Sequence, residues 1–329
     1  MTTNRHRLLT YLKENLGLWV SGEVISNQMG ISRAAIWKHI KRLKDAGHLI
    51  QSAPKKGYCL TQAADLLSPE QIAGGLNTRF MGRPSVVVFR ETDSTNLQAK
   101  ILAIQGAAEG TLVAAETQTQ GRGRRGRTWF SPAGQSIYIS MILRPPMAPA
   151  QAPQITLMTA VAVARTLLKT GLKARIKWPN DILVEGKKIA GILTEISTEM
   201  DQVDWMIVGL GLNVNTPAGQ MPPEIRDIAT SVRIQKGRPV SRVELLCALL
   251  ENFEACYEQL KAEGFGPIME QWRQMTDIIG QQIYVDVMDT RYTGTVAAVD
   301  DDGVLILEDD QGQIRRIFSG DVTRVRPNG

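Results

Sequence analysis

Apolar residues recur at helical spacing in the first fifth of the chain, in two runs separated by a glycine. The first run covers residues 21–29, Gly30 interrupts it, and the second extends from Ser32 to about Leu43. The second run repeats at i, i+4 and i+7, which predicts a buried helix face made by Ile36, Ile40 and Leu43. Residues 49–60 then predict a β-hairpin whose turn is 54–57. This order is typical of a winged helix-turn-helix.

Beyond residue 65 the pattern changes to short apolar strands alternating with helices. The expected strands are 86–89, 112–115, 137–143, 175–178, 182–184, 188–193 and 206–211, and the expected helices start near residues 69, 94, 155 and 242. Residues 213–238 are rich in Pro, Gly, Asn and Gln, which predicts a mobile segment. From residue 276 about five short strands predict a small β barrel. We therefore expect an α/β (α+β) chain with domains at 1–64, 65–275 and 276–329.

Composition favours an ordinary cytoplasmic protein. The chain has 329 residues, 43% hydrophobic and 22% charged, and no apolar run approaches the about 18 residues of a membrane span. The three cysteines, Cys59, Cys247 and Cys256, lack metal-ligand spacing, which predicts reduced structural thiols. We expect neither secretion nor a membrane anchor.

Charge is concentrated at the N-terminal end. Residues 1–64 hold ten Lys and Arg against three Asp and Glu, a balance of +7, whereas the rest of the chain carries −2. With the helix-turn-helix pattern, this asymmetry favours a DNA-binding module over a small protein-interaction domain. The residues expected to contact DNA are Ser32, Arg33, Ala34, Trp37, Lys38, Lys41, Lys55 and Lys56.

The run from Gly121 to Arg127, G-R-G-R-R-G-R, combines three glycines with four guanidinium groups. It fits G-x-G-x-x-G and nearly fits a Walker A motif, but both motifs require a helix directly after the glycines. Residues 128–143 instead predict a turn and a strand. Guanidinium groups form bidentate charged bonds with phosphoryl oxygens, so the loop suits a phosphoanhydride or a mixed anhydride. The alternative is an exposed basic loop, against which the adjoining Trp129 and Phe130 favour a closing lid.

Five further blocks accompany the arginine loop in a fixed order along the chain. They are 21–23 with 32–36 and 38–40, then 93–96, 129–132, 177–181 with 188–193, and 209–213. In these residues the chain resembles the family of bifunctional biotin protein ligases that also repress the biotin operon. One departure is Gln120, where the family usually has a small residue such as alanine.

The resemblance implies a central mixed-sheet domain of the biotin/lipoate-ligase type, an SH3-like C-terminal barrel and an ATP-dependent, AMP-forming reaction. Biotin and ATP would give biotinyl-5′-AMP, from which biotin passes to a lysine of a biotin carboxyl carrier protein, a subunit of acetyl-CoA carboxylase. Catalytic roles are implied for Arg124, Lys177 and Lys188. Biotin contacts are implied for Ser94, Thr95, Asn96, Gln118, Gly121, Arg122, Gly123, Arg124, Lys188, Gly209 and Gly211. ATP or adenylate contacts are implied for Arg122, Arg124, Arg125, Arg127, Trp129, Lys177, Asn180 and Asn213, and a role in placing Mg²⁺ for Asp181.

The resemblance also implies that biotinyl-5′-AMP acts as corepressor of a homodimer on operator DNA of biotin genes. Three alternatives stay open at this point: a lipoate or octanoyl ligase on the same fold, a transcriptional regulator with an inactive catalytic domain, and a ligase without a repressor role. Taken singly, Lys177 and Lys188 could equally be solvated strand residues.

Overall fold

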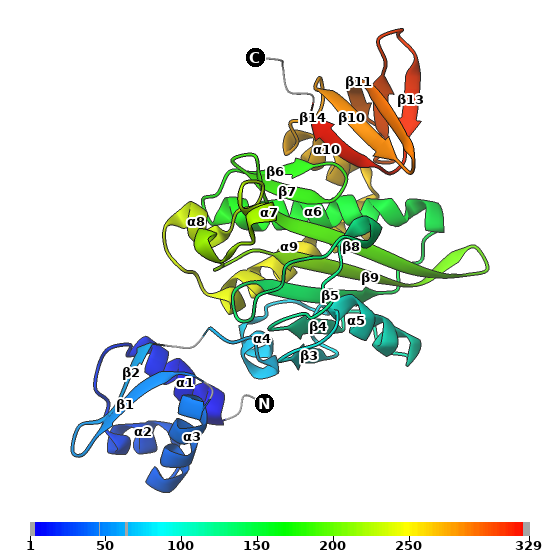
Figure 1. Cartoon of the computed structure of the whole chain (residues 1–329). Helices are drawn as coiled ribbons and strands as arrows, with labels where there is room; N and C mark the ends of the chain where they lie inside the picture. Colours follow the sequence, from blue (N-terminus) through cyan, green and yellow to red (C-terminus); the bar gives the residue numbers. More distant parts are fainter. Residues whose placement is uncertain (1–3, 46, 63–64, 325–329) are drawn as a thin grey trace. The chain divides into compact units, whose positions relative to one another are not determined.

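The structure, a computed structural model, describes residues 4–45, 47–62 and 65–324. These residues form two compact units, with the division between Gly75 and Leu76. Figure 1 traces both units, and each is described by itself. The ends of the predicted domains, residues 1–3, 63–64 and 325–329, lie outside the described residues. The domain boundaries expected at 65 and 276 stay predictions.

Helices and one hairpin build the N-terminal unit. Their bounds are α1 (Asn4–Glu14), α2 (Gly22–Met29), α3 (Arg33–Asp45), β1 (Leu49–Ala53), β2 (Gly57–Gln62) and α4 (Pro69–Gly75). The Ser21 hydroxyl caps α2 by accepting from the Val24 N–H, and Gly30 ends the helix in the left-handed conformation. β1 and β2 pair antiparallel around the expected turn. The predicted helix-turn-helix and wing are thus confirmed.

The core of this unit joins the two expected helices to α1, which the apolar pattern did not predict. Leu8 and Leu12 of α1 are fully buried against Ile25, Ile36 and Leu60. Burying such side chains stabilises a fold by about 1.5–3 kcal/mol each. The small unit therefore has an apolar core of its own, and the polar faces of α3 and the wing remain outside it.

A seven-stranded mixed sheet forms the centre of the second unit, in the order β3-β4-β5-β9-β8-β7-β6. Only β3 and β4 are parallel among these pairs. The strands are β3 (Val86–Phe89), β4 (Leu112–Ala115), β5 (Ile137–Leu143), β6 (Ala174–Lys177), β7 (Asp181–Val184), β8 (Lys187–Glu199) and β9 (Gln202–Leu212). The predicted strands are confirmed, and β8 and β9 extend several residues beyond their expected ends.

Helices of the second unit pack on this sheet and on one another. They are α5 (Thr95–Ile104), α6 (Ala152–Lys169), α7 (Pro223–Arg226), α8 (Val232–Lys236), α9 (Arg242–Glu263) and α10 (Gly266–Gln274). α5 packs on β4, β5 and β9, whereas α6 packs on β6 to β8 and is covered in turn by α9 and α10. This double cover explains why α6 is apolar on most sides, as its sequence predicts.

The C-terminal strands form a second sheet in the same unit, in the order β13-β12-β11-β10-β14, with antiparallel pairing. They are β10 (Gln282–Val287), β11 (Thr290–Val299), β12 (Leu305–Glu308), β13 (Ile314–Ile317) and β14 (Asp321–Arg324). The expected number of strands is confirmed, and β13 and β14 are the sheet edges. The buried Trp178 indole donates to the backbone oxygen of Gly303 at 3.0 Å, which ties this sheet to the central one.

Residues 213–238 have more fixed structure than their composition indicates. The segment contains α7 and α8, and its polar side chains bond its own backbone. Asn213 donates to the oxygen of Thr230 at 3.1 Å, and Ser231 donates to that of Thr216 at 2.7 Å. Short polar side chains can satisfy buried backbone groups in this way. The segment therefore contains two short helices that its composition did not predict, and the expectation that it is mobile stays a prediction.

Candidate active site and nucleic-acid interface

Polar side chains gather where α5 begins beside the central sheet. The carboxylate of Asp93 accepts from the Ser94 N–H at 2.6 Å and from the Gln98 side chain at 3.0 Å. These hydrogen bonds, that from Gln98 first, lower the pKa of Asp93 below its usual range. Asp93 thus binds the first turn of α5, whereas the Ser94 hydroxyl makes no capping bond.

Gln118 connects this helix start to the segment after β4. Its side-chain oxygen accepts from the Thr95 N–H at 2.8 Å and from the Thr95 hydroxyl at 3.2 Å. Its side-chain nitrogen donates to the Ser131 hydroxyl at 3.1 Å. Two residues predicted for the biotin site, 23 positions apart, are therefore in direct contact.

Asn96 is buried among three adjacent strands. Its side-chain oxygen accepts from Ser140 at 2.6 Å, and its nitrogen donates to Glu195 at 2.7 Å. Strand register explains this meeting, because Gly209 of β9 lies opposite both Ser140 of β5 and Leu193 of β8. A Cβ at Gly209 would collide with the Asn96 side-chain oxygen. Gly209 therefore makes room for Asn96 in this structure.

Ser140 and Glu195 were missed in the sequence. A serine inside the apolar run 137–143 is a weak signal of a polar partner, since buried hydroxyl groups need one. Glu195 had no comparable signal, because β8 is only half-buried at that end and a carboxylate there is ordinary. Both become site residues only through the pairing of strands distant in sequence.

Trp129 lies on the glycines of β8 and β9. A Cβ at Gly211 would collide with Trp129 Cε2, and one at Gly191 would lie 2.9 Å from Cζ3. Lys188 Nζ is 5.3 Å from the indole centroid. The buried indole nitrogen has no hydrogen-bond partner among the described residues. Trp129 thus closes the arginine loop over the sheet, consistent with the lid interpretation.

The two predicted lysines meet beside one carboxylate. Lys188 Nζ is 2.7 Å from Asp181 Oδ1. Burial lowers the pKa of Lys177, with the positive charge of Lys188 acting in the same direction and the charge of Asp181 opposing it. Partly desolvated ammonium groups bind an incoming anion more strongly than solvated ones do.

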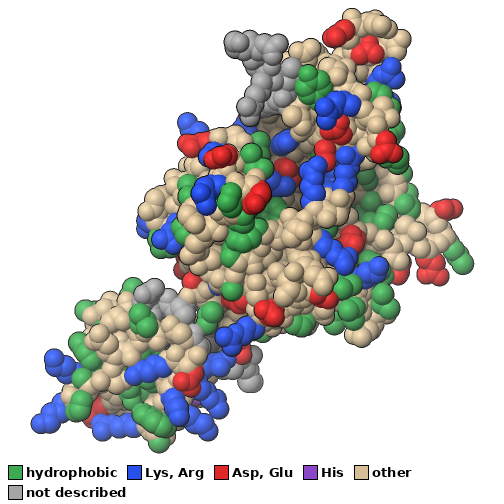
Figure 2. All heavy atoms as spheres, in the orientation of Figure 1, with side chains coloured by type: hydrophobic (Ala, Val, Ile, Leu, Met, Phe, Trp, Pro, Cys, Tyr) green, Lys and Arg blue, Asp and Glu red, His purple; other side chains and the backbone are tan. Residues whose placement is uncertain are grey.

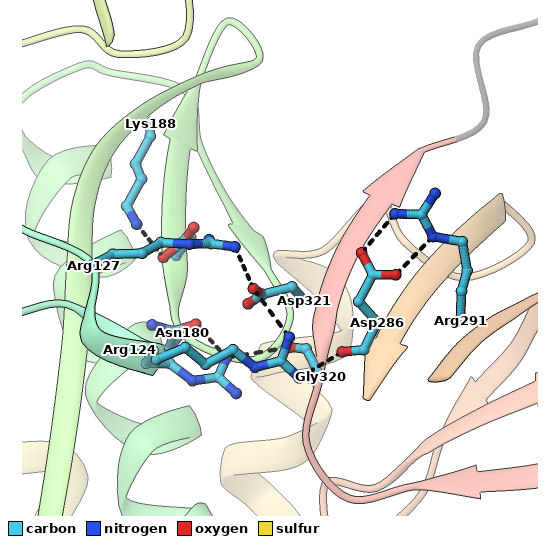
Figure 3. A network of polar contacts seen from close by, with 10 residues as sticks. Arg124, Arg127, Asn180, Lys188, Asp286, Arg291, Gly320 and Asp321 are labelled. Atoms are coloured by element: carbon cyan, nitrogen blue, oxygen red, sulfur yellow. Dashed lines mark hydrogen bonds and ion pairs between the residues drawn. The ribbon is translucent and has the colours of Figure 1, made fainter. Parts of the chain in front are cut away.

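The arginine loop, defined as residues 121–127, contains a short 3-10 turn over Arg124–Gly126 and leads to β5 without a following helix. Arg124 donates to Asn180 Oδ1 at 3.0 Å and to the Gly320 oxygen at 3.3 Å. Burial lowers the pKa of Arg124 from its very high usual value. Arg122 is exposed. Figure 3 shows the loop arginines beside Asn180, Lys188 and Asp321.

Glycines shape the base of the loop. A Cβ at Gly121 would lie 2.6 Å from the Trp129 oxygen, and one at Gly123 would lie 3.3 Å from the Arg127 oxygen. The Gly123 N–H donates to that same Arg127 oxygen at 2.7 Å. The Rossmann and P-loop alternatives are not supported, because no helix N-terminus follows these glycines.

The predicted metal residue, Asp181, pairs with Lys188 in this structure. Among the described residues there is no group of three or more His, Cys, Asp or Glu arranged to hold a metal ion. Mg²⁺ is commonly held by one or two carboxylates together with substrate phosphates. Asp181 fits that kind of site as a single protein ligand, beside the lysines that would meet the phosphates.

The remaining predicted residues divide into two groups. Asn180 lies in the cluster, since its side chain accepts from Arg124 and donates to the Ile192 oxygen at 2.8 Å. The side chain of Asn213, by contrast, is used to bind the Thr230 oxygen. The cysteines are free and buried, as expected.

The predicted nucleic-acid contacts of the N-terminal unit lie on α3 and the wing. Ser32 caps α3 through its hydroxyl, and the exposed Arg33 pairs with Glu23 at 3.0 Å. The Trp37 side chain is 60% exposed, with Lys41 Nζ 5.8 Å from its ring centroid. Ala34, Lys38, Lys55 and Lys56 are also exposed. Figure 2 shows Lys and Arg side chains gathered over this unit, as a phosphate-binding surface requires.

Family models match the chain in three places. The HTH domain model covers residues 4–59, the Biotin/lipoate A/B protein ligase family model covers 88–213, and the Biotin protein ligase C terminal domain model covers 278–324. The Bifunctional ligase/repressor BirA of Bacillus spizizenii is 38% identical over 98% of both chains.

The chain belongs to the family of bifunctional biotin protein ligases. It is accordingly a biotin ligase with a DNA-binding repressor domain. The Biotin--[acetyl-CoA-carboxylase] ligase of Paracoccus denitrificans is 37% identical and covers 69% of this chain and 95% of its own. The biotin protein ligase of Aquifex aeolicus in complex with biotin and ATP has a TM-score of 0.63 and 28% identity, over 74% of this chain and 99% of its own.

Membership of this family argues against two of the open alternatives. These are a transcriptional regulator with an inactive catalytic domain and a ligase without a repressor role. No helix in the described parts of this ligase is both long and apolar enough to cross a membrane.

Proposed function

We propose that this ligase joins biotin to the AMP part of ATP, between the buried polar groups around Asn96 and the neighbouring cluster of Arg and Lys side chains. It then transfers biotin to a lysine of a biotin carboxyl carrier protein. The observation that carries the proposal is the adjacency of two unlike surfaces. Buried amide and hydroxyl groups lie on one side of Trp129, and five cations, Arg124, Arg125, Arg127, Lys177 and Lys188, lie near Asp181 and Asp321.

The polar side suits the ureido group of biotin. Ser94, Thr95 and Gln118 offer hydroxyl, N–H and amide groups beside Asn96. A site that uses buried polar groups rejects analogues unable to pair with them. Gly209 and Gly211 act indirectly in this proposal, because they give space to Asn96 and Trp129.

The cationic side suits the triphosphate. An oxygen of the biotin carboxylate attacks the α-phosphorus, the bond to the β-phosphate breaks, and pyrophosphate leaves with the electron pair. Lys177 and Lys188 would offset negative charge on the α-phosphoryl oxygens, and loss of one such donor typically costs about 3 kcal/mol of barrier. Mg²⁺ would be held by the phosphates and Asp181, and would neutralise charge on the leaving pyrophosphate.

Transfer then takes place at the carbonyl carbon of the biotinyl group in the adenylate. The uncharged amine of the carrier lysine attacks, the bond to the AMP oxygen breaks, and the amide forms with release of a proton to solvent. Arg124, with Arg122, Arg125 and Arg127, would keep the adenylate in place until the carrier arrives. The acetyl-CoA carboxylase named for the Paracoccus relative suggests which carrier to test.

The repressor role would use the same intermediate. Biotinyl-5′-AMP acts as corepressor in this proposal, by favouring a homodimer that places two helix-turn-helix units on a palindromic operator. A single such unit contacts only a half-site, so specific binding benefits from the dimer.

The proposal is tested by mass spectrometry of the purified protein with Mg²⁺, ATP and either biotin or lipoate. We expect biotinyl-5′-AMP and pyrophosphate with biotin and no adenylate with lipoate. Lys188→Met should lower adenylate formation by about 100-fold. An adenylate formed from lipoate alone would instead favour the lipoate ligase named in the same family description.

A further inference from the structure

The tip of the arginine loop is held by the C-terminal sheet. β10 and β14 pair so that Asp286 lies opposite Asp321. Arg125 donates to the backbone oxygen of Asp286 at 2.6 Å and to Asp321 Oδ2 at 3.4 Å. Arg127 donates to the same Asp321 oxygen at 2.5 Å. Strand pairing thus brings acceptors for two arginines to one place, as Figure 3 shows.

The two carboxylates at this place have different partners. Asp286 is occupied by Arg291, with contacts of 2.7 and 3.0 Å from one guanidinium. Asp321 faces the arginine loop instead, and within the described residues both ion pairs of the loop end on it. The Asp321 side chain is 19% exposed, whereas those of Arg125 and Arg127 are 35% and 70% exposed, so solvent partly screens both ion pairs.

The loop backbone also indicates an anchored conformation. Arg125 has φ 55° and ψ 37°, in the left-handed region that residues other than glycine seldom adopt. Such a conformation persists where surrounding contacts hold it. The side-chain contacts of Arg125 with Asp286 and Asp321 hold it together with the backbone hydrogen bonds that close the loop between Gly123 and Arg127.

Docking leaves donors for a ligand. Within the described residues, the hydrogen bonds of Arg124 use Nη1 and that of Arg127 uses Nη2. A guanidinium carries five N–H groups in a planar fork, so one edge can bind protein while another binds a phosphoryl oxygen.

We propose that Asp321 is a positioning residue: with Arg125 docked on the C-terminal sheet, it holds Arg127 near Lys177 for contact with the phosphates of ATP and of the adenylate. The docking itself stands on the contacts above, and the identity of the ligand rests on the proposed function. Holding the loop in place reduces the entropy lost when a nucleotide binds.

The first test needs no ligand. Trypsin cleaves after arginine, so cuts after Arg125 and Arg127 report loops that have left the sheet. We expect Asp321→Asn to be cut about fivefold faster than the wild type, because proteolysis follows the population of the open form. Asp321→Glu should restore much of the protection.

Asp301→Asn is the matched control, since Asp301 is an exposed carboxylate of the same unit that pairs with Arg273 at 2.6 Å, away from the loop. It should be cut at the wild-type rate. Equal cutting of Asp321→Asn and the wild type would overturn the docking role.

The second test measures kinetics with biotin, Mg²⁺ and ATP. In Asp321→Asn we expect the KM for ATP and the rate of adenylate loss each to rise about fivefold, with kcat at saturating ATP changed less than about twofold. If Asp321 had only a structural role, its replacement would lower kcat or protein stability without a selective rise in the KM for ATP. A lower KM for ATP in Asp321→Asn would show that Asp321 competes with the phosphates, and the positioning role would be wrong.

The two tests fail separately. If Asp321→Asn is cut faster than the wild type but the wild-type protein forms no adenylate, the proposed function is refuted and the docking role stands. If Asp321→Asn forms adenylate normally, is cut no faster than the wild type and keeps the wild-type KM for ATP, only the positioning role is refuted.

Discussion

At the scale of single residues, the site depends on glycines, which leave space, as much as on the side chains that fill that space. Gly209 and Gly211 face the same side of β9, two residues apart, and each gives its space to a protein side chain, Asn96 or Trp129. Their proposed part in biotin binding is therefore to admit these two side chains, whose positions determine the shape of the pocket.

Gly211→Ala tests this argument. The added Cβ would collide with Trp129 Cε2, so the indole and the lid segment must move. We expect the Kd for biotin, measured by titration calorimetry, to rise at least about tenfold, with a loss of stability of about 1–3 kcal/mol.

Gly219→Ala is the control, because no atom lies within 4 Å of its added Cβ. It should bind biotin like the wild type. If both variants behave alike, the close packing of Trp129 on β9 does not shape the site.

At the scale of elements, helices and strands were predicted well where local pattern decides them. The helices after Ser32, Ser68 and Ser241 begin where they were expected, because a serine followed by a helical pattern accepts from neighbouring N–H groups. Ser140, Glu195 and Asp321 were not, because their contacts with Asn96 and with the arginine loop join residues 44, 99 and up to 196 positions apart. Such contacts depend on strand register, which no single segment of sequence specifies.

The wing, residues 53–57, allows a prediction at this scale. Its Lys55 and Lys56 are exposed, and Lys56 Nζ lies 5.8 Å from the Trp19 ring centroid. If they contact phosphates, replacing both by alanine should weaken binding to duplex DNA of any sequence. The slope of log K against log salt concentration should fall by about 0.9 for each phosphate that the variant no longer neutralises.

Arg7→Ala/Lys13→Ala provides the matched control, since it removes two charges from the exposed side of α1. Fluorescence anisotropy with a labelled random duplex at several salt concentrations gives both slopes. A wing variant with the wild-type slope, or a control whose affinity falls further than that of the wing variant, would contradict DNA contact by the wing.

At the scale of the whole molecule, the proposed corepressor role of biotinyl-5′-AMP requires that ligand binding in one unit influence DNA binding by the other. The proposed route is assembly: biotinyl-5′-AMP favours the homodimer, and the dimer supplies two helix-turn-helix units. Typical coupling of 1–3 kcal/mol corresponds to an effect of about 5–150-fold. When biotinyl-5′-AMP is added, we expect the dimer dissociation constant, measured by sedimentation, to decrease by a factor in that range. With AMP it should stay unchanged.

Thermodynamic linkage makes this prediction stringent. If the adenylate tightens the dimer by some factor, the dimer must bind the adenylate more tightly by the same overall factor. Calorimetric titrations at protein concentrations below and above the dimer constant would measure the second factor independently. Agreement of the two factors would support coupling through assembly. A dimer constant that ignores the adenylate, in a protein whose affinity for operator DNA still responds to it, would place the coupling within the monomer instead.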